Sequence, residues 1–308
     1  MRVVFFGTPE FAVPSLEALL GEGFDVLTAV TQPDRPQGRS RSLAVPSPVK
    51  QAALADDVPV LQPERPTDPA FVQTLRDLAP DVGVVVAYGH ILKPELLSIP
   101  ARGMVNLHPS LLPDLRGAAP IEWAIINGLR QTGVTIIQMD SGMDSGPILH
   151  TIPEVLPPDI TGGELSAHLS EVGAEALVEA LMLLDQGAVQ PRPQDADRAT
   201  YAPKLTRETA RVDWTIPAER IARLIRALDP RPGAWTDLDG QAVKLFGAAA
   251  GGVRGGTPGE VLQADGGLRI AAADGSVAVD EVQAEGKARM SVAEWVRGRG
   301  VRVGERFQ

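Results

Sequence analysis

The sequence contains no cysteine, and this absence excludes disulfide bonds, thiolate catalysis and zinc sites built from cysteine. It also suits a reducing compartment such as the cytosol. The histidines, at positions 90, 108, 150 and 168, do not have the spacing of metal ligands. We therefore expect no bound metal.

Long apolar runs are missing as well. No stretch approaches the roughly 20 apolar residues that a helix needs to cross a bilayer. The opening segment, Met1–Gly7, turns into a Gly-Thr-Pro loop before a signal-peptide pattern develops. We expect neither membrane insertion nor secretion, and we predict a cytoplasmic protein that is a monomer.

A third absent pattern is the G-x-G-x-x-G motif, which brings the backbone close to the pyrophosphate of a dinucleotide. The first apolar run ends instead in Gly7-Thr8-Pro9. This difference argues against a nicotinamide cofactor.

Basic residues are fewer than acidic ones, 29 against 39, which gives a net charge of −10. The deficit is uneven, because residues 207–308 hold 15 basic and 14 acidic residues. Phosphate binding by this part would require local clustering of arginines rather than a bulk field. The composition permits a nucleic-acid partner without demonstrating one.

With 308 residues, of which 44% are hydrophobic, the chain is long enough for two domains. Its first 150 residues alternate apolar runs with helical patterns, which predicts a doubly wound α/β domain with a mostly parallel sheet. Apolar residues at helical spacing also predict a core helix over residues 162–185. The predicted strands are Val3–Phe6, Val26–Thr31, Val58–Leu61, Val82–Ala87, Met104–Leu107 and Val134–Met139.

Residues 190–206 lose this periodicity and become rich in proline and charge, as is typical of a linker. We therefore predict a first domain over 1–189, a linker over 190–206 and a second domain over 207–308. The second domain begins with a helix, and five short strands then favour a small β-barrel. Residues 248–256 are predicted to be a mobile loop of low complexity. The helix is Pro217–Leu228, and the strands are Ala234–Leu238, Ala242–Phe246, Glu260–Ala264, Leu268–Ala272 and Val277–Val282.

The most reactive side chains follow the apolar run at 104–107. The two-residue period of a strand points Asn106 and His108 to the same face. An imidazole can exchange protons near neutral pH, and an amide can polarise a carbonyl without changing its own charge. A carboxylate on another loop, Asp144, could orient the imidazole. By itself, however, N-x-H is a weak pattern, and a histidine after a strand is commonly a structural hydrogen-bonding group.

The order of these patterns along the chain resembles the folate-dependent formyltransferases over most of residues 1–200. The resemblance rests on the N-x-H strand, the Ser-Leu-Leu-Pro loop, residues 116–120, and the glycine-flanked acid at 144. Residues 6–12, 31–39 and 46–50 are similar to the branch of this family that acts on an aminoacylated tRNA. Residues 225–235 and 286–291 are similar to the C-terminal domain of the same branch.

This resemblance implies a reaction, two substrates and a set of site residues. A formyl group would pass from 10-formyltetrahydrofolate to the amino group of methionyl initiator tRNA, without a covalent enzyme intermediate. Asn106 and His108, as a proton donor, would stabilise a tetrahedral oxyanion, while Asp144 would orient His108 and help to relay the amine proton. The second domain would be OB-like and would bind tRNA. The loop expected to hold the folate comprises Ser110, Leu111, Leu112 and Pro113.

Residues 31–42 are too polar and too often interrupted by proline and glycine to form a helix or strand. Connections this long inside compact domains are usually functional or disordered. Arg35, Arg39 and Arg41 could pair with phosphates, and the resemblance implies that this insertion contacts the end of the tRNA. The alternative is a solvated basic loop.

Two rival functions use the same residues. Another formyltransferase, or a formylfolate hydrolase, could use Asn106, His108 and Asp144 to transfer the formyl group to a sugar amine, to glycinamide ribonucleotide or to water. The second domain and the arginine-containing loop argue against that reading. A non-catalytic folate-binding or RNA-binding protein is disfavoured because all three reactive side chains are present.

Overall fold

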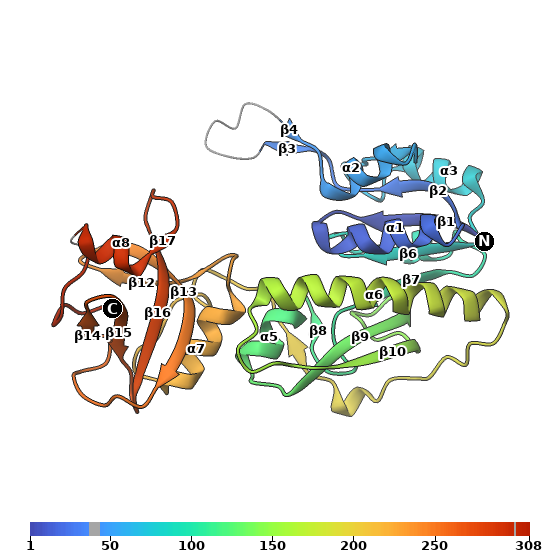
Figure 1. The fold of residues 1–308 in the computed structure, drawn as a ribbon. Helices are drawn as coiled ribbons and strands as arrows, with labels where there is room; N and C mark the ends of the chain where they lie inside the picture. Colours follow the sequence, from blue (N-terminus) through green and yellow to red (C-terminus); the bar gives the residue numbers. More distant parts are fainter. Residues whose placement is uncertain (37–43, 299) are drawn as a thin grey trace. The chain divides into compact units, whose positions relative to one another are not determined.

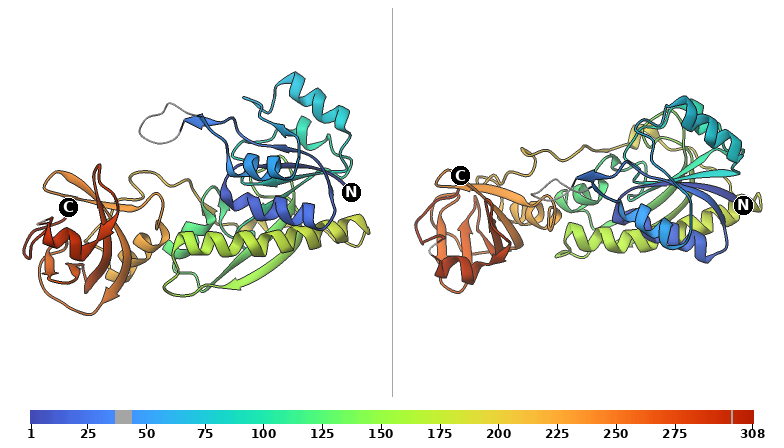
Figure 2. Two further views of the ribbon diagram at one scale, coloured as in Figure 1. Left: turned by 45° about the horizontal axis from the view of Figure 1, so that its top comes forward. Right: turned by 90° about the horizontal axis from the view of Figure 1, so that it is seen from above.

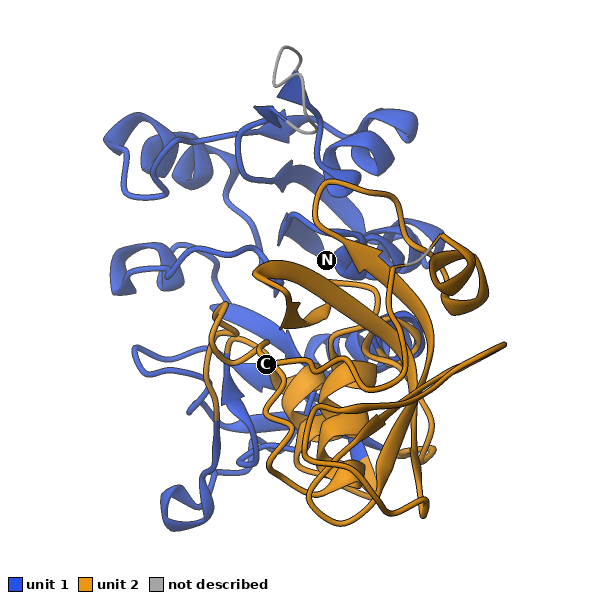
Figure 3. Ribbon diagram, turned by 90° about the vertical axis from the view of Figure 1, so that its left-hand side faces the viewer, with its two compact units in different colours: residues 1–117, 132–154, 166–201 blue, residues 118–131, 155–165, 202–308 orange. Residues whose placement is uncertain are grey.

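The structure is a computed structural model of the chain, and it describes residues 1–36, 44–298 and 300–308. These residues form two compact units, which Figure 3 shows in different colours. Unit 1 comprises Met1–Gly117, Thr132–Glu154 and Ser166–Tyr201, and unit 2 comprises Ala118–Gln131, Val155–Leu165 and Ala202–Gln308. The units interleave along the sequence, and the division at 190–206 stays a prediction.

Unit 1 contains a seven-stranded sheet in the order β10-β9-β7-β6-β1-β2-β5. The five strands from β7 to β5 are parallel, and β9 runs antiparallel to β7 (Figure 1). The predicted mostly parallel sheet is therefore confirmed, and its apolar central strands are buried, as strands covered on both faces must be. The strands are β1 Arg2–Gly7, β2 Asp25–Val30, β5 Val60–Leu61, β6 Val82–Val86, β7 Met104–His108, β9 Gln131–Gln138 and β10 Ile148–Val155.

Helices lie on both faces of this sheet (Figure 2). Helices α3 and α4 cover one face, where Phe71 and Leu96 pack with Val4, Phe6 and Met104. Helices α1 and α6 lie next to each other on the opposite face. Several helices begin with proline, whose missing N–H would be unpaired in a first turn anyway. Their bounds are η1 Glu10–Ala12, α1 Val13–Gly21, α2 Pro48–Ala55, α3 Pro69–Leu78, α4 Pro94–Leu97 and α6 Gly162–Asp185, the last as predicted.

The shorter elements of the first 202 residues lie outside this sheet. They are β3 Arg35–Pro36, β4 Ala44–Val45, β8 Arg116–Gly117, η2 Ala196–Arg198 and β11 Tyr201–Ala202. Strands β3 and β4 pair with each other in an antiparallel ribbon. Residues 37–43, which lie between them, are outside the described part of the chain.

Unit 2 is built on an antiparallel sheet in the order β12-β13-β16-β15-β14, with β17 paired to β16. Its core includes Trp214 and the apolar side of α7, where Ile221 and Ile225 are completely buried. The small β domain expected from the sequence is confirmed. Its elements are α7 Ala218–Ala227, β12 Ala234–Leu238, β13 Gln241–Gly251, β14 Val261–Ala264, β15 Leu268–Ala271, β16 Ser276–Ala284, β17 Met290–Ser291 and α8 Val292–Arg297.

Two features of unit 2 differ from the sequence-based expectation. Residues Ala248–Gly251, assigned to a mobile loop, continue strand β13 and pair with Ser276–Val279 of β16. Alanine and glycine are weak strand formers, so the main-chain hydrogen bonds of the partner strand decide this conformation. Helix α5, Pro120–Ile126, also belongs to this unit and packs against α7.

Within the described residues, no helix combines the length and the apolar character that a membrane span requires.

Candidate active site

Strand β7 places Asn106 and His108 on one face of the sheet. Leu107, between them, faces α6, because a methyl group at Gly173 would lie 2.7 Å from Cδ1 of Leu107. Only glycine allows the helix to approach the strand this closely. Asn106 and His108 therefore point to the opposite face, as the strand period predicted. Within the described residues the Asn106 amide makes no hydrogen bond, so it is available to a ligand.

The chain turns back directly after His108, and Thr135 of β9 holds the turn. The Thr135 hydroxyl donates to the Ser110 carbonyl at 2.7 Å and accepts from the Leu112 amide at 3.2 Å. The Ser110 hydroxyl donates in turn to the Asp114 carbonyl at 2.5 Å. The loop predicted to hold the folate is thus fixed by internal hydrogen bonds.

The side chains of this loop divide into two kinds. Ser110 and Leu112 are buried, and Leu112 packs with Ile137 and Ile148. Leu111 and Pro113 are half-buried. Direct contact of these four residues with a folate stays a prediction, and the two half-buried side chains are the ones positioned to make it.

The structure brings Asp144 next to His108. The Asp144 Oδ2 atom lies 3.7 Å from Nδ1 of His108, and the Gly117 amide donates to the same oxygen at 2.9 Å. On the other side of the ring, Nε2 of His108 lies 2.9 Å from the Leu115 carbonyl oxygen. A carbonyl oxygen only accepts, so Nε2 carries the proton and Nδ1 faces the carboxylate.

Burial lowers the pKa of His108, whose residue is only 4% exposed. The Asp144 carboxylate and the Leu115 carbonyl raise the pKa and partly offset the burial, while the Arg116 guanidinium lowers it. The imidazole is therefore neutral at neutral pH. It can take up a proton on Nδ1, where Asp144 would stabilise the imidazolium.

This lowered pKa predicts a loss of stability in acid. In the unfolded chain His108 has its ordinary pKa of about 6.5, which is higher than its pKa in the folded state. Below about pH 6.5 the unfolded state therefore binds a proton at His108 more readily than the folded state does. The free energy of unfolding should therefore fall as the pH drops from 7 to 5. Denaturant titrations of the wild type and His108→Gln test this, since the variant should lose less stability over that range. Equal losses in the two proteins would contradict the assignment.

The segment predicted to bind tRNA begins at a polar network. Lys50 Nζ donates to Asp34 Oδ2 at 2.6 Å and to Gln62 Oε1 at 2.7 Å, and Gln62 Nε2 donates to Asp34 Oδ1 at 2.7 Å. The hydrogen bond from Lys50 is the main cause of the lowered pKa of Asp34. These bonds fix the chain directly before Arg35, which is exposed on β3.

The structure thus pairs His108 with Asp144 and places Asn106 on the same strand face as His108. Among the described residues, Arg35 makes no hydrogen bond or ion pair with these three. Arg39 and Arg41 lie outside the described residues.

Sequence reasoning missed two residues that hold the site together, Thr135 and Gln194. Thr135 is completely buried in the apolar run of β9, and a buried hydroxyl in such a strand is a signal that could have been used. Gln194 was assigned to the predicted linker. Its two side-chain hydrogen bonds to the Asp144 and Gly146 carbonyls have no signal in the sequence.

Among the residues that the structure describes, no group of three or more acidic or histidine side chains is arranged to hold a metal ion.

The end of β7 in this doubly wound sheet thus combines a buried imidazole, a carboxylate paired with it and a side-chain amide that has no hydrogen-bond partner among the described residues. The family model for formyl transferases matches residues 1–181, and the model for the formyl transferase C-terminal domain matches residues 204–300. The chain therefore belongs to the formyl transferase family.

Relatives support this assignment over the full length. The chain is 48% identical to a methionyl-tRNA formyltransferase of Roseiflexus sp., covering 100% of this chain and 95% of the relative. It is 46% identical to a methionyl-tRNA formyltransferase of Chloroflexus aurantiacus, and the match covers 99% of this chain and 100% of the relative. The fold is similar to that of HypX from Aquifex aeolicus in complex with tetrahydrofolic acid, with a TM-score of 0.66 and 21% identity over 96% of this chain and 46% of HypX.

Proposed function

We propose that this chain transfers a formyl group from 10-formyltetrahydrofolate to the amino group of methionyl initiator tRNA, in support of translation initiation. The observation that carries the proposal is the His108–Asp144 pair on the strand that also presents the Asn106 amide. Full-length similarity to proteins named methionyl-tRNA formyltransferase supports the choice of substrate. Because initiator tRNA is used in the cytoplasm, the proposal also places the enzyme there.

In the proposed reaction, the neutral amine attacks the formyl carbon. Negative charge then develops on the formyl oxygen, and the attacking nitrogen becomes positively charged and must lose a proton. The Asn106 amide donates to the developing oxyanion. His108, neutral at first, takes up the amine proton, and Asp144 stabilises the resulting imidazolium. The imidazolium then donates a hydrogen bond to the oxyanion. When the intermediate breaks down, it transfers the proton to the folate nitrogen that leaves the formyl carbon. Atoms and protons balance without a covalent enzyme intermediate.

We propose that the loop of Ser110, Leu111, Leu112 and Pro113 holds the pterin-containing donor next to Asn106. Its internal bonds to Thr135 give it a fixed shape, which lowers the entropy that binding would cost. HypX, a protein of similar fold, has been solved in complex with tetrahydrofolic acid, which supports a folate ligand for this fold.

For the tRNA, we propose contacts from Arg35, Arg39 and Arg41 and from the arginines of unit 2. Composition alone required local clustering, and unit 2 contains such a cluster. The guanidinium carbons of Arg207 and Arg211 lie 4.6 and 5.5 Å from the ring centroid of Trp235. Arginines held on an aromatic ring still present donors to phosphate oxygens.

A formylation assay tests the proposed function. With 10-formyltetrahydrofolate as the donor, the acceptors are methionyl initiator tRNA, methionyl elongator tRNA, an amino sugar nucleotide and free methionine. We expect rapid formylation of the initiator tRNA and slow or no reaction with the other amines. Preferred reaction with a small amine, or hydrolysis of the donor without transfer, would contradict the proposal.

Replacing Arg39 and Arg41 together with alanine should weaken tRNA binding and leave folate binding unchanged. Each phosphate contact that is lost should make the log–log salt dependence of tRNA binding shallower by about 0.7 to 0.9. Binding titrations at several salt concentrations measure this slope. A matched control is Arg76→Ala on α3, where the arginine is exposed and paired with Glu95. An unchanged slope in the double variant would reduce the segment to a solvated loop.

A further inference from the structure

The side chain of Gln194 is completely engaged in hydrogen bonds around Asp144. Its Nε2 atom donates to the Asp144 carbonyl at 2.8 Å and to the Gly146 carbonyl at 2.7 Å. Its Oε1 atom accepts from Nε and Nη2 of Arg116, at 3.1 and 2.6 Å. Both amide hydrogens are therefore donated, and the amide oxygen accepts two hydrogen bonds. No hydrogen-bonding capacity of the side chain remains unused.

Gln194 thereby joins the two segments that hold Asp144. One segment is the loop that carries Asp144 itself, whose main chain receives both Nε2 bonds. The other is β8, where Arg116 is only 6% exposed and where the next residue, Gly117, donates to the Asp144 carboxylate at 2.9 Å. A single side chain thus fixes Asp144 through its main chain and, by way of β8, through its carboxylate.

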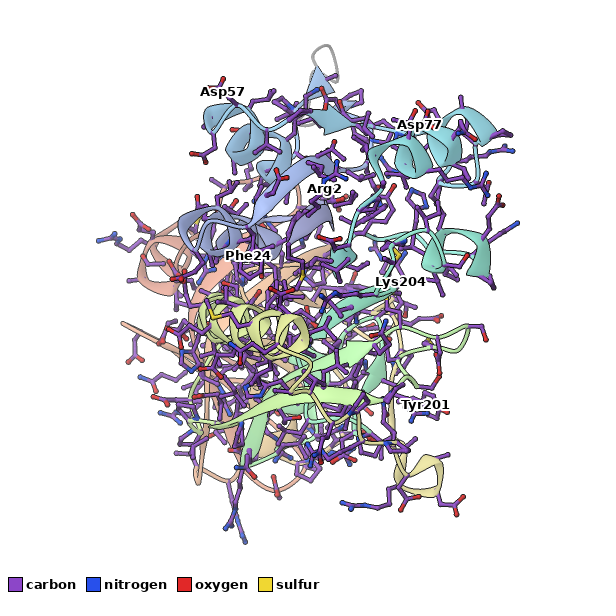
Figure 4. All side chains as sticks on the ribbon, turned by 90° about the vertical axis from the view of Figure 1, so that its right-hand side faces the viewer. Arg2, Phe24, Asp57, Asp77, Tyr201 and Lys204 are labelled. Atoms are coloured by element: carbon purple, nitrogen blue, oxygen red, sulfur yellow. The ribbon has the colours of Figure 1, made fainter. Side chains whose placement is uncertain are left out.

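The segment that carries Gln194 is itself held on both sides of the site. Before Gln194, Arg192 exchanges two main-chain hydrogen bonds with Ile148, at 2.8 and 2.9 Å. After it, the Thr200 hydroxyl accepts from the Leu115 amide at 2.8 Å, and the carbonyl of Leu115 is the one that binds His108. The segment ends at Tyr201, which is exposed (Figure 4).

Asp144 needs such support because its backbone is unusual. Its φ of 50° lies in the left-handed region, which residues other than glycine rarely adopt, although aspartate tolerates it better than most. Such conformations persist where surrounding contacts over-determine them. The two bonds from Gln194 fall on the carbonyls of Asp144 and Gly146, directly at this turn.

We propose that Gln194 is a positioning residue for formyl transfer, and that its amide fixes the Asp144 carboxylate against the His108 imidazole. The inference rests on the proposed function, because it assigns Gln194 to the same proton-transfer step. Gln194 itself does not contact the reacting atoms. Its loss should impair proton transfer while leaving both substrate sites intact.

Two variants separate the contributions of the amide. Gln194→Met keeps the length of the side chain and removes all its hydrogen bonds. Gln194→Glu keeps an acceptor for Arg116 but loses the donors to the Asp144 and Gly146 carbonyls. The control is Gln190→Met, which changes an exposed glutamine in the same segment.

Steady-state kinetics on methionyl initiator tRNA should show kcat lowered about 10-fold to 100-fold in both Gln194 variants, because small misplacements of catalytic groups have effects of this size. The KM values for tRNA and folate should stay within about twofold of the wild type. The control should keep full kcat. Unchanged kcat in both Gln194 variants, or equal changes in KM and kcat with a matching loss of folded protein, would overturn the proposal.

A second measurement does not depend on catalysis, and so it separates this inference from the proposed function. NMR titration of the imidazole reports the pKa of His108, which is faced by the Asp144 carboxylate, the Arg116 guanidinium and the Leu115 carbonyl. If Asp144 withdraws in Gln194→Met, the main influence that raises this pKa weakens, so the pKa should fall further. The acid limb of the kcat profile should shift to lower pH with it. A pKa equal to that of the wild type would refute the positioning role even in a protein that formylates another amine.

Discussion

His108→Ala is expected to lower kcat by about 10²-fold or more, with little change in the affinity for folate. The imidazole is buried and lies between the Leu115 carbonyl and Asp144. In the proposed reaction it exchanges a proton only as the tetrahedral oxyanion forms and breaks down. A group that acts in the transition state affects kcat rather than ground-state binding. Single-turnover formylation of methionyl initiator tRNA, together with a folate-binding titration, measures the two effects separately.

The matched control for this variant is His168→Ala. His168 is exposed on α6, and its Nε2 atom makes a hydrogen bond with Oε2 of Glu154 at 2.8 Å, so its removal eliminates an imidazole and its carboxylate contact without changing β7. The control should retain full activity. Near-normal turnover by His108→Ala would remove this histidine from the mechanism.

Asn106→Ala is expected to lower kcat by about 10²-fold to 10³-fold, the usual effect of losing one oxyanion donor. Within the described residues the amide makes no other hydrogen bond, so the substitution should leave the fold unchanged. Asn106→Asp is the more informative change, because it has nearly the same shape but carries a negative charge. It should be no more active than the alanine variant, since a carboxylate repels a developing oxyanion.

Kinetics and thermal unfolding of both Asn106 variants test this assignment, with Asn127→Ala, an exposed position at the end of α5, as the control. Full activity in Asn106→Asp would show that the amide is not an oxyanion donor. Loss of folded protein in Asn106→Ala would instead point to a structural role.

Much of the fold follows from local patterns. The valine-rich runs predicted the central strands, because a strand that is buried on both faces is apolar at every position. The spacing of apolar residues predicted both ends of α6, because one side of this helix is buried. The same period of two placed Asn106 and His108 on one face of β7. That shared face depends only on one short strand, and so it could be predicted from the sequence.

Other features depend on partners that are distant along the chain. The edge strand β10, Ile148–Val155, has no strong apolar pattern and was not predicted, and Ala248–Gly251 join β13 because β16 supplies hydrogen-bonding partners. Helix α5 packs with α7 in unit 2, although it lies in the middle of the segment predicted as the first domain. Local propensity is weak at these places, and tertiary contacts decide the outcome.

The sequence by itself determined the parallel sheet, the long helix, the small β domain and the candidate catalytic side chains. Only the tertiary structure decided how Asp144 meets His108, because that geometry depends on a left-handed turn held by Gln194, 50 residues further along the chain. In the sequence Gln194 lies in a stretch rich in proline and charge and has no periodic partner. A hydrogen bond from a distant side-chain amide to a main-chain carbonyl produces no pattern in the sequence, since every residue has a main-chain carbonyl.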